Sequence, residues 1–389
     1  MPQPLRKQQY TENYDYGTVK MYPKRHLQRK KTKKKKNIFV VLIRFLFLSI
    51  FLSAFSYYAA PNLWSNYFEP IILNRVLNRH FKPDVKPFIS PHLNYLYNSE
   101  LFGEHLLVSP QKEFQTIIPI LASSELTTIK KDLEVLFAKY PKMHPSVYVW
   151  EYTQAGEIAI NADEIFPAAS IIKLPILFEL FRKIDRSAQD GTNSTDLSKK
   201  LLYDHKNKTS GSGELQYSAL NKYYSVDYLA KIMITHSDNS ATNMLIEEAG
   251  GIGAINSSLR SYGLDKIKLE NRLPDLEGTN KISARQIATM LYNIDNPNFL
   301  SDKSKIVIKE YMANVQNRRL LQAGLPQEAI LIHKTGDIGT MLGDAGIVYA
   351  QNGKKYIVVM LVKRPFNDYS ARDMIQEASK IIYNGILKL

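Results

Sequence analysis

The chain has 389 residues, of which 44% are hydrophobic, and a formal net charge of +14 at pH 7. It contains no cysteine, which excludes disulfide bonds, thiolate catalysis and cysteine-bound metal. This length allows two domains of ordinary size, or one large domain with appended segments. The positive charge is concentrated near the N-terminus, and the chain after residue 36 carries a net charge of only +4.

The basic N-terminal region directly precedes an apolar segment. Residues 1–36 contain twelve Lys and Arg against Glu12 and Asp15, a net charge of +10, and the stretch 37–60 carries one charge, Arg44. About 20 apolar residues span a bilayer as a helix, and Lys/Arg mark the cytoplasmic flank. We therefore expect a cytoplasmic head, a single transmembrane helix at 37–60 in the inner membrane, and the remaining chain on the extracytoplasmic, periplasmic side.

Two other interpretations of the N-terminal region stay open. A cleaved signal peptide needs a small-x-small exit site, for which Ala54–Ser56 is passable, but a 36-residue polar head suits an uncleaved anchor better. Nucleic-acid binding is less favoured, because the basic run abuts an apolar segment and is not interleaved with aromatic residues. We expect the membrane, and no nucleic acid, as the partner of this region.

The organisation changes at about residue 123. Residues 61–122 are rich in Pro, Asn, Tyr and Phe without sustained periodicity, which is typical of a spacer. Beyond them, helical and alternating patterns follow one another. The expected elements are a helix at 124–140 capped by Ser124, a hairpin at 146–162, a second hairpin at 344–364 and a final helix at 371–389.

Between the two hairpins the pattern is almost wholly helical. Such segregation predicts an α+β fold, in which an antiparallel sheet is flanked by helices and contains an inserted all-helical subdomain. The domain 123–389 would then have a sheet part, 123–167 with 325–389, and a helical part, 168–324. One transmembrane helix would precede it.

A lysine interrupts the apolar run "FPAASIIKLPILFEL" at residues 166–180. Lys173 follows Ser170 by three residues, which places both side chains on one face of a helix. A buried ammonium is disfavoured, so a partly neutral lysine could accept the serine proton. The alternative is a lysine whose charged end reaches solvent. A second Ser-x-x-Lys, Ser109–Lys112, contains a proline and is attributed to chance.

Two further motifs accompany this pair. Ser237-Asp238-Asn239 lies in "ITHSDNSATNML", and Lys334-Thr335-Gly336 lies in "IHKTGDIGTMLGDAGIV". Taken singly, the first could be a turn or a helix cap and the second a strand end. His236 and His333 precede the two motifs, and we interpret both as packing or hydrogen-bonding residues.

In this order, the three motifs are those of class A β-lactamases and penicillin-binding proteins. From about residue 123 to 389, the chain resembles the class A β-lactamase family of penicillin-recognising serine hydrolases. The resemblance implies that Ser170 is the acylated nucleophile and that Lys173 manages its proton. It further implies that Ser237 passes a proton to the departing nitrogen, while Asn239 holds the substrate amide.

The same resemblance assigns the C-terminal motif to substrate binding. Lys334 and Thr335 would hold the substrate carboxylate, and the strand that continues through Gly336 would pair with the substrate backbone. The backbone N–H groups of Ser170 and Asp337 would form the oxyanion hole. No metal and no cofactor are implied, and we expect a monomer.

One part of the family pattern is missing. Class A enzymes use a glutamate in a Glu-x-x-Leu-Asn pattern as the base that hydrolyses the acyl-enzyme, and this pattern is absent after Ser-Asp-Asn. Of the nearby acids, Glu277 is the first candidate because Asn280 could help to hold the water. Asp275 is the second candidate, and Glu270 is expected to make an ion pair. All three could instead be solvated loop charges.

The sequence leaves three functions open. The first is a membrane-anchored class A β-lactamase that opens β-lactam rings through a Ser170 acyl-enzyme. The second is a D-alanyl-D-alanine peptidase or transpeptidase that β-lactams inhibit. The third is a β-lactam sensor that is acylated without turnover. The deacylating base decides between the first and the other two.

Overall fold

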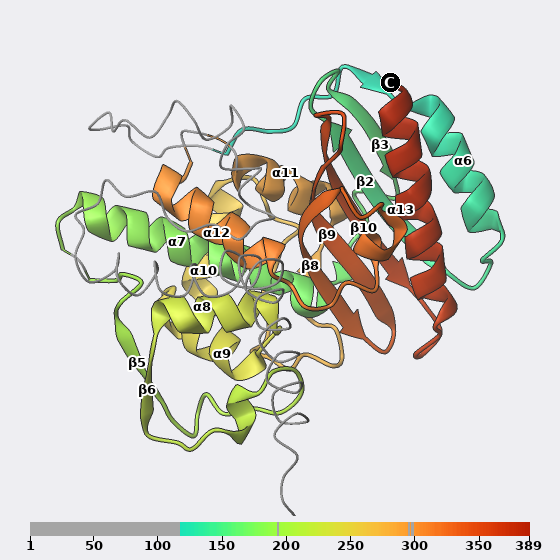
Figure 1. Cartoon of the computed structure of the whole chain (residues 1–389). Helices are drawn as coiled ribbons and strands as arrows, with labels where there is room; N and C mark the ends of the chain where they lie inside the picture. Colours follow the sequence, from blue (N-terminus) through green and yellow to red (C-terminus); the bar gives the residue numbers. More distant parts are fainter. Residues whose placement is uncertain (1–116, 193, 295, 297–298) are drawn as a thin grey trace, which may run out of the picture. The chain divides into compact units, whose positions relative to one another are not determined.

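A computed structural model describes residues 117–389 except 193, 295, 297 and 298. These residues contain a six-stranded sheet with helices on both faces, which confirms the α+β prediction (Figure 1). No helix in the described part of the chain is long and apolar enough to cross a membrane. The predicted segment 37–60 and the spacer up to residue 116 lie outside the described residues.

The strands of the large sheet follow the order β1-β3-β2-β10-β9-β8. Neighbouring strands are antiparallel except β1 and β3, which run parallel. The prediction of a wholly antiparallel sheet was therefore wrong at one edge, because a two-residue strand leaves no pattern in the sequence. The strands are β1 (Ser124–Glu125), β2 (His144–Glu151), β3 (Gly156–Ile160), β8 (Ile330–Ile338), β9 (Met341–Tyr349) and β10 (Lys355–Lys363).

The first helix begins later than its sequence suggests. Ser124 was expected to cap it, but Ser124 belongs to β1, and the helix starts at Thr127 without a side-chain cap. The Leu126 N–H instead donates to the Glu157 carbonyl of β3 at 2.8 Å. Sheet pairing thus outcompetes the local cap. Both predicted hairpins and the final helix are confirmed.

Two layers of helices enclose the sheet. α6 (Thr127–Ala138) and α13 (Ser370–Lys388) pack together on one face (Figure 1). The other face meets a helical block, whose members are η3 (Ala169–Ile172), α7 (Lys173–Gln189), α8 (Val226–Thr235), α9 (Asn239–Glu248), α10 (Gly251–Ser261), α11 (Ala284–Ile294) and α12 (Asp302–Ala313). Smaller elements are β4 (Phe166–Pro167), β5 (Lys200–Tyr203), η4 (Leu215–Tyr217), β6 (Lys222–Ser225), β7 (Lys281–Ile282) and η5 (Leu321–Gly324).

Alternation along the central strands produces two hydrophobic cores. On β10, Ile357, Val359 and Leu361 belong to the core shared with the helical block. Val358 and Met360 belong to the core under α6 and α13. Since successive strand residues point to opposite faces, one strand anchors both layers.

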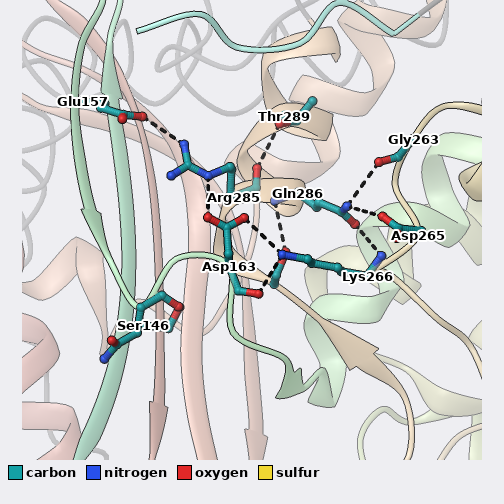
Figure 2. Close-up of polar contacts among 11 residues, drawn as sticks. Ser146, Glu157, Asp163, Gly263, Asp265, Lys266, Arg285, Gln286 and Thr289 are labelled. Atoms are coloured by element: carbon teal, nitrogen blue, oxygen red, sulfur yellow. Dashed lines mark hydrogen bonds and ion pairs between the residues drawn. The ribbon is translucent and has the colours of Figure 1, made fainter. Parts of the chain in front are cut away.

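A polar network joins the sheet to the helical block beside the segment that leads into η3. Figure 2 shows Arg285 of α11 between Asp163 and Glu157, with Nε–Oδ2 and Nη1–Oε2 distances of 2.9 and 3.0 Å. Lys266 adds a 3.3 Å contact to Asp163 Oδ1 and a 3.0 Å hydrogen bond to its carbonyl. The planar guanidinium suits two carboxylates at once. The network therefore holds Asp163, six residues before η3, against the helical block.

Candidate active site

Ser170 and Lys173 lie at the junction of a short 3-10 turn and a long helix. Ser170 was expected on the same helix as Lys173, but it belongs to η3, and α7 begins at Lys173. A 3-10 helix has about three residues per turn, so side chains three apart lie directly above one another. Lys173 Nζ accordingly lies 2.9 Å from Ser170 Oγ.

Lys173 is completely buried and surrounded by oxygen atoms. Besides Ser170 Oγ, Nζ lies 2.7 Å from the Ser237 carbonyl, 3.0 Å from Ser237 Oγ and 2.9 Å from Asn239 Oδ1. The carbonyl and amide oxygens can only accept hydrogen bonds, so they occupy two N–H groups. The third position of the nitrogen faces the two hydroxyls. In a neutral amine this position is a lone pair that can accept the proton of Ser170.

The surroundings of Lys173 favour that neutral amine. Burial lowers the pKa of Lys173 well below the ordinary value of 10.5, and the positive charge of Lys334 lowers it further. The Asp238 carboxylate acts in the opposite sense. Because desolvation disfavours an ammonium, Lys173 can act as a general base towards a hydroxyl within hydrogen-bonding distance.

The Ser-Asp-Asn motif forms a turn that aims two groups at Lys173. Ser237 has a φ of 57°, in the left-handed region, which directs both its carbonyl and its hydroxyl to Nζ. Asp238 caps α9 by accepting from the Ala241 N–H at 2.9 Å, and it also accepts from the Leu215 N–H at 2.8 Å. Asn239 then starts α9. The helix cap made by Asp238 thus stabilises the strained left-handed backbone of Ser237.

The Lys-Thr-Gly motif lies on β8, an edge strand of the described sheet. Lys334 is 1% exposed, and its Nζ donates to the Thr335 carbonyl at 2.7 Å. Burial lowers the pKa of Lys334 to about 7, although the Asp344 carboxylate opposes this. An edge strand has unpaired backbone groups that can receive a peptide-like ligand. In the described sheet β8 therefore has a free edge at which a substrate backbone could pair, and the pairing itself stays a prediction.

Gly336 allows β8 to approach η3 closely. A Cβ at this position would lie 3.1 Å from both Ala169 Cβ and Ile171 Cγ1, and 3.2 Å from the Ile171 backbone nitrogen. These contacts are tighter than ordinary van der Waals distances. The absence of a side chain at Gly336 thus sets the spacing between the strand and the turn that carries Ser170.

Asp337 follows at the exposed end of β8. Its carboxylate pairs with Arg364, whose Nε also donates to the Gly339 carbonyl at 3.0 Å. This pair fixes the turn between β8 and β9. The assignment of the Ser170 and Asp337 N–H groups to an oxyanion hole stays a prediction.

The three candidate bases lie in one loop and differ in their surroundings. Asp275 accepts from Thr279 N and Oγ1 at 2.9 and 2.7 Å, and from Asn280 N at 2.7 Å, so both its oxygens organise the loop. Glu270 forms an ion pair, as expected, but its partner is Lys268, whereas the neighbouring Arg272 pairs with Glu247. Glu277 is exposed. None of these contacts presents a carboxylate to Ser170.

Asn280 does not have the role that the sequence suggested. It is 1% exposed, and its Oδ1 accepts from the Glu270 and Asn271 N–H groups at 2.7 and 3.0 Å. Its Nδ2 donates to the Asn271 carbonyl at 3.1 Å. The amide is therefore used to shape the loop, and its supposed help to Glu277 finds no support.

Leu273 was missed because sequence reasoning considered only acids in this loop. Its N–H and carbonyl bond to the Oδ1 and Nδ2 of Asn243 at 2.9 and 2.7 Å. Asn243 lies one helical turn after Asn239 on α9, on the same face. Placed on the Glu-x-x-Leu-Asn pattern, residues 273–277 read Leu-x-x-Leu-Glu. Leu273 then stands where the family has its glutamate, and Leu276 matches the leucine of the pattern.

The histidines beside the motifs make hydrogen bonds. His236 Nδ1 lies 2.7 Å from Thr235 Oγ1, and its Nε2 lies 2.9 Å from Gln316 Nε2. His333 Nδ1 lies 2.8 Å from Asp344 Oδ1. Their interpretation as hydrogen-bonding residues is confirmed. Among the residues that the structure describes, no cluster of three or more His, Asp or Glu could hold a metal ion.

A family model described as "Beta-lactamase enzyme family" matches residues 128–386. The chain belongs to the class A β-lactamase family. The β-lactamase of Streptomyces albus G is 27% identical over 252 residues, 61% of this chain and 78% of that protein. The ROB-1 β-lactamase of Haemophilus influenzae is 26% identical over 280 residues, 69% and 88% of the two chains.

A solved structure titled PBP-A has higher sequence identity to this chain. It is 34% identical, with a TM-score of 0.65, over 70% of this chain and 100% of that one. A mutant of PBP-A, described as an acyl-enzyme complex with penicillin G, has the same values. The relatives of this chain thus include proteins named as β-lactamases and a protein named PBP-A.

Gly336→Ala should slow the reaction of this β-lactamase-family site with a fluorescent penicillin by about tenfold, because the new methyl group displaces Ser170 relative to β8. The rate constant for covalent labelling measures this, and a thermal melt reports the fold. Gly253→Ala, in open space on α10, is the control and should label normally. An unchanged labelling rate in Gly336→Ala would show that the spacing of β8 and η3 is not critical.

Proposed function

We propose that the chain is a penicillin-binding serine acyltransferase, acylated at Ser170, with D-alanyl-D-alanine peptides as natural substrates and β-lactams as slowly released inhibitors. This reverses the order in which the sequence placed the first two functions. The observation that carries the proposal is the loop 270–280. In this loop Leu273, and not a carboxylate, occupies the position at which the Glu-x-x-Leu-Asn pattern has the deacylating glutamate.

The proton transfers of the acylation half need only groups that surround Lys173. Lys173 takes the proton of Ser170 Oγ, and the oxygen attacks the substrate carbonyl to form a tetrahedral intermediate. The C–N bond then breaks and leaves an ester on Ser170, while Ser237, 3.0 Å from the same Nζ, passes the proton from Lys173 to the departing nitrogen. A peptide would release D-alanine, whereas a β-lactam nitrogen stays tethered to the acyl group. Lys334 and Thr335 would hold the substrate carboxylate throughout.

The deacylation half requires a base for water. The accepting atom of a base must lie within about 3 Å of the oxygen whose proton it removes. Asp275 is engaged with its own loop, Glu270 is paired with Lys268 and Glu277 is exposed. The penicillin acyl-enzyme is therefore expected to persist. The acyl-enzyme complex of a PBP-A mutant with penicillin G, at 34% identity, supports acylation of this site by a penicillin.

The β-lactamase function is the second candidate, because the curated relatives named above are β-lactamases. One structural feature favours it. A Cβ at Gly278 would lie 2.7 Å from Pro167 Cβ and 2.9 Å from Ile338 Cδ1. The backbone next to Glu277 therefore lies close to both Pro167, which precedes η3, and the end of β8. A sensor function would resemble the peptidase in its stable acyl-enzyme, but a sensor would release no D-alanine from peptides.

We also propose that residues 37–60 anchor the protein in the inner membrane, with the catalytic domain on the periplasmic side. The support is the +10 flank directly before the apolar stretch.

Benzylpenicillin should convert the wild-type protein to a one-to-one adduct. The lifetime of this adduct should be much longer than the turnover time of a β-lactamase. Intact-protein mass spectrometry detects it. Ser170→Ala should give no adduct, and Ser109→Ala, at the other Ser-x-x-Lys, should label normally. Sustained hydrolysis of a chromogenic cephalosporin by the wild type would replace the peptidase proposal by the β-lactamase one. Release of D-alanine from a D-alanyl-D-alanine peptide separates peptidase from sensor.

Three variants of the loop 270–280 test which residue, if any, is the deacylating base. Leu273→Glu should shorten the life of the penicillin adduct by roughly a hundredfold, the lower end of what general-base catalysis contributes. Leu276→Glu, at a side chain that is 76% exposed, is the matched control and should not change the lifetime. Glu277→Gln should also leave it unchanged. A longer lifetime in Glu277→Gln would identify Glu277 as the base and contradict the proposal.

Deletion of residues 1–60 should move the protein from the membrane fraction to the soluble fraction. In intact spheroplasts of the full-length protein, added protease should remove a C-terminal tag. A protected tag with membrane-bound protein would contradict the proposed orientation, and a soluble full-length protein would contradict the anchor.

A further inference from the structure

A buried carboxylate lies on the strand next to Lys334 without belonging to any of the three motifs. Asp344 of β9 has no exposed surface. It is the registered partner of Thr335, and Lys334 pairs with Ala345. Because successive strand residues point to opposite faces, Asp344 lies on the face towards α13, while Lys334 lies on the face towards the helical block. The sheet is the layer between the two charges.

Asp344 is held in place by two donors. His333 Nδ1 lies 2.8 Å from Oδ1 and 3.1 Å from Oδ2, and the Leu321 N–H donates to Oδ2 at 3.2 Å. Ser379 of α13 supports this end of η5 by donating to the Leu321 carbonyl at 2.8 Å. A buried carboxylate costs stability unless it is hydrogen-bonded, so this arrangement indicates a fixed negative charge rather than a chance acid.

Lys334 needs such a charge because its own surroundings oppose ionisation. Its ammonium is buried, and the contact to the Thr335 carbonyl is neutral. His333 adds no negative charge. Asp344 is the carboxylate that raises the pKa of Lys334, against burial that lowers it to about 7.

The other charged groups near β8 do not take over this role. Lys173 at the start of α7 is positive when protonated, and so are the α12 residues Lys305 and Lys309. The two acids of α12 are engaged elsewhere. Asp302 pairs with Lys305 at 3.0 Å, and Glu310 interacts with charged groups of α8.

We propose that Asp344 is a positioning residue that keeps Lys334 charged, and so sets the upper pH limit for recognising the substrate carboxylate. The inference rests on the proposed function, in which Lys334 binds that carboxylate. Asp344 touches neither the substrate nor Ser170, and it acts through Lys334 alone.

The direction in which the pH profile of acylation should shift depends on which protonation state of Lys334 binds the substrate. Recognition of a carboxylate requires Lys334 as an ammonium, so acylation should fall as the pH rises above about 7. Removing the negative charge of Asp344 lowers the pKa of Lys334. The high-pH decline of the acylation rate constant, called the falling limb below, should therefore move to lower pH by about one unit. This is the lower end of the effect of one neighbouring opposite charge.

The experiment compares the rate constant of acylation by benzylpenicillin, from about pH 5 to 10, in wild type, Asp344→Asn and Asp344→Glu. Asp344→Asn should move the limb down by about one unit and slow acylation about tenfold on that limb. Asp344→Glu, which keeps the charge, should restore the wild-type limb. With the methyl ester of benzylpenicillin, which has no carboxylate, wild type and Asp344→Asn should have the same profile.

Asp185→Asn is the matched control. Asp185 is also buried and accepts hydrogen bonds from Ser301 and Ser304, but it lies roughly 18 Å along α7 from Lys173. Its profile should equal that of wild type. An unmoved limb in folded Asp344→Asn would overturn the inference, as would an equal shift with the methyl ester. Absence of any adduct on the wild type would instead contradict the proposed function.

A second variant applies if Asp344→Asn does not fold. His333→Gln keeps a donor for the Asp344 carboxylate but cannot carry a positive charge. It should leave the limb at the wild-type position or at higher pH. A limb at lower pH in His333→Gln would overturn the inference.

Discussion

The complete burial of Lys173 is the constraint on which the site depends. An ammonium without water must be compensated by nearby acceptors, or else lose its proton. Ser237 and Asn239 supply acceptors for two N–H groups, and the remaining position of the nitrogen points at hydroxyls. The same desolvation that costs stability therefore favours the neutral amine, which can act as a base. The left-handed conformation of Ser237 is the local cost of this arrangement.

The rest of the structure serves to hold this lysine between three elements. α7 presents the side chain, the turn before α9 supplies its acceptors, and β8 packs through Gly336 against η3, which carries Ser170. The network of Arg285, Asp163 and Lys266 secures the segment before η3 (Figure 2). The buried ammonium of Lys334 lowers the pKa of Lys173 further, which favours the neutral amine. Because burial also lowers the pKa of Lys334 itself, the Asp344 carboxylate behind β8 has functional value.

The sequence was informative wherever chemistry or periodicity is local. The alternation at 344–364 predicted a hairpin, and the lysine within an apolar run predicted a buried amine. It was not informative where tertiary pairing decides. Ser124 has the chemistry of a cap but is taken by β1, because pairing with β3 satisfies the Leu126 N–H. Ser170 was placed on a helix, whereas close packing against Gly336 accompanies a tighter 3-10 turn.

The same limit explains the residues that sequence reasoning missed. Asp344 gains its meaning from the register between β8 and β9, which places it beside His333 and behind Lys334. Leu273 could have been found by placing the whole family pattern on the loop, but a search for acids passes over a leucine. Asn280 was credited with holding water because its bonds to the loop backbone cannot be seen in a sequence.

The claim that Lys173 is a neutral base can be measured without any substrate. Protein containing lysine labelled with carbon-13 at the ε-carbon is titrated by NMR, and Lys173→Arg identifies the resonance. The account predicts that the Lys173 resonance titrates well below the ordinary lysine value of 10.5. A resonance that titrates at or above that value would show a permanent ammonium, and would contradict the account.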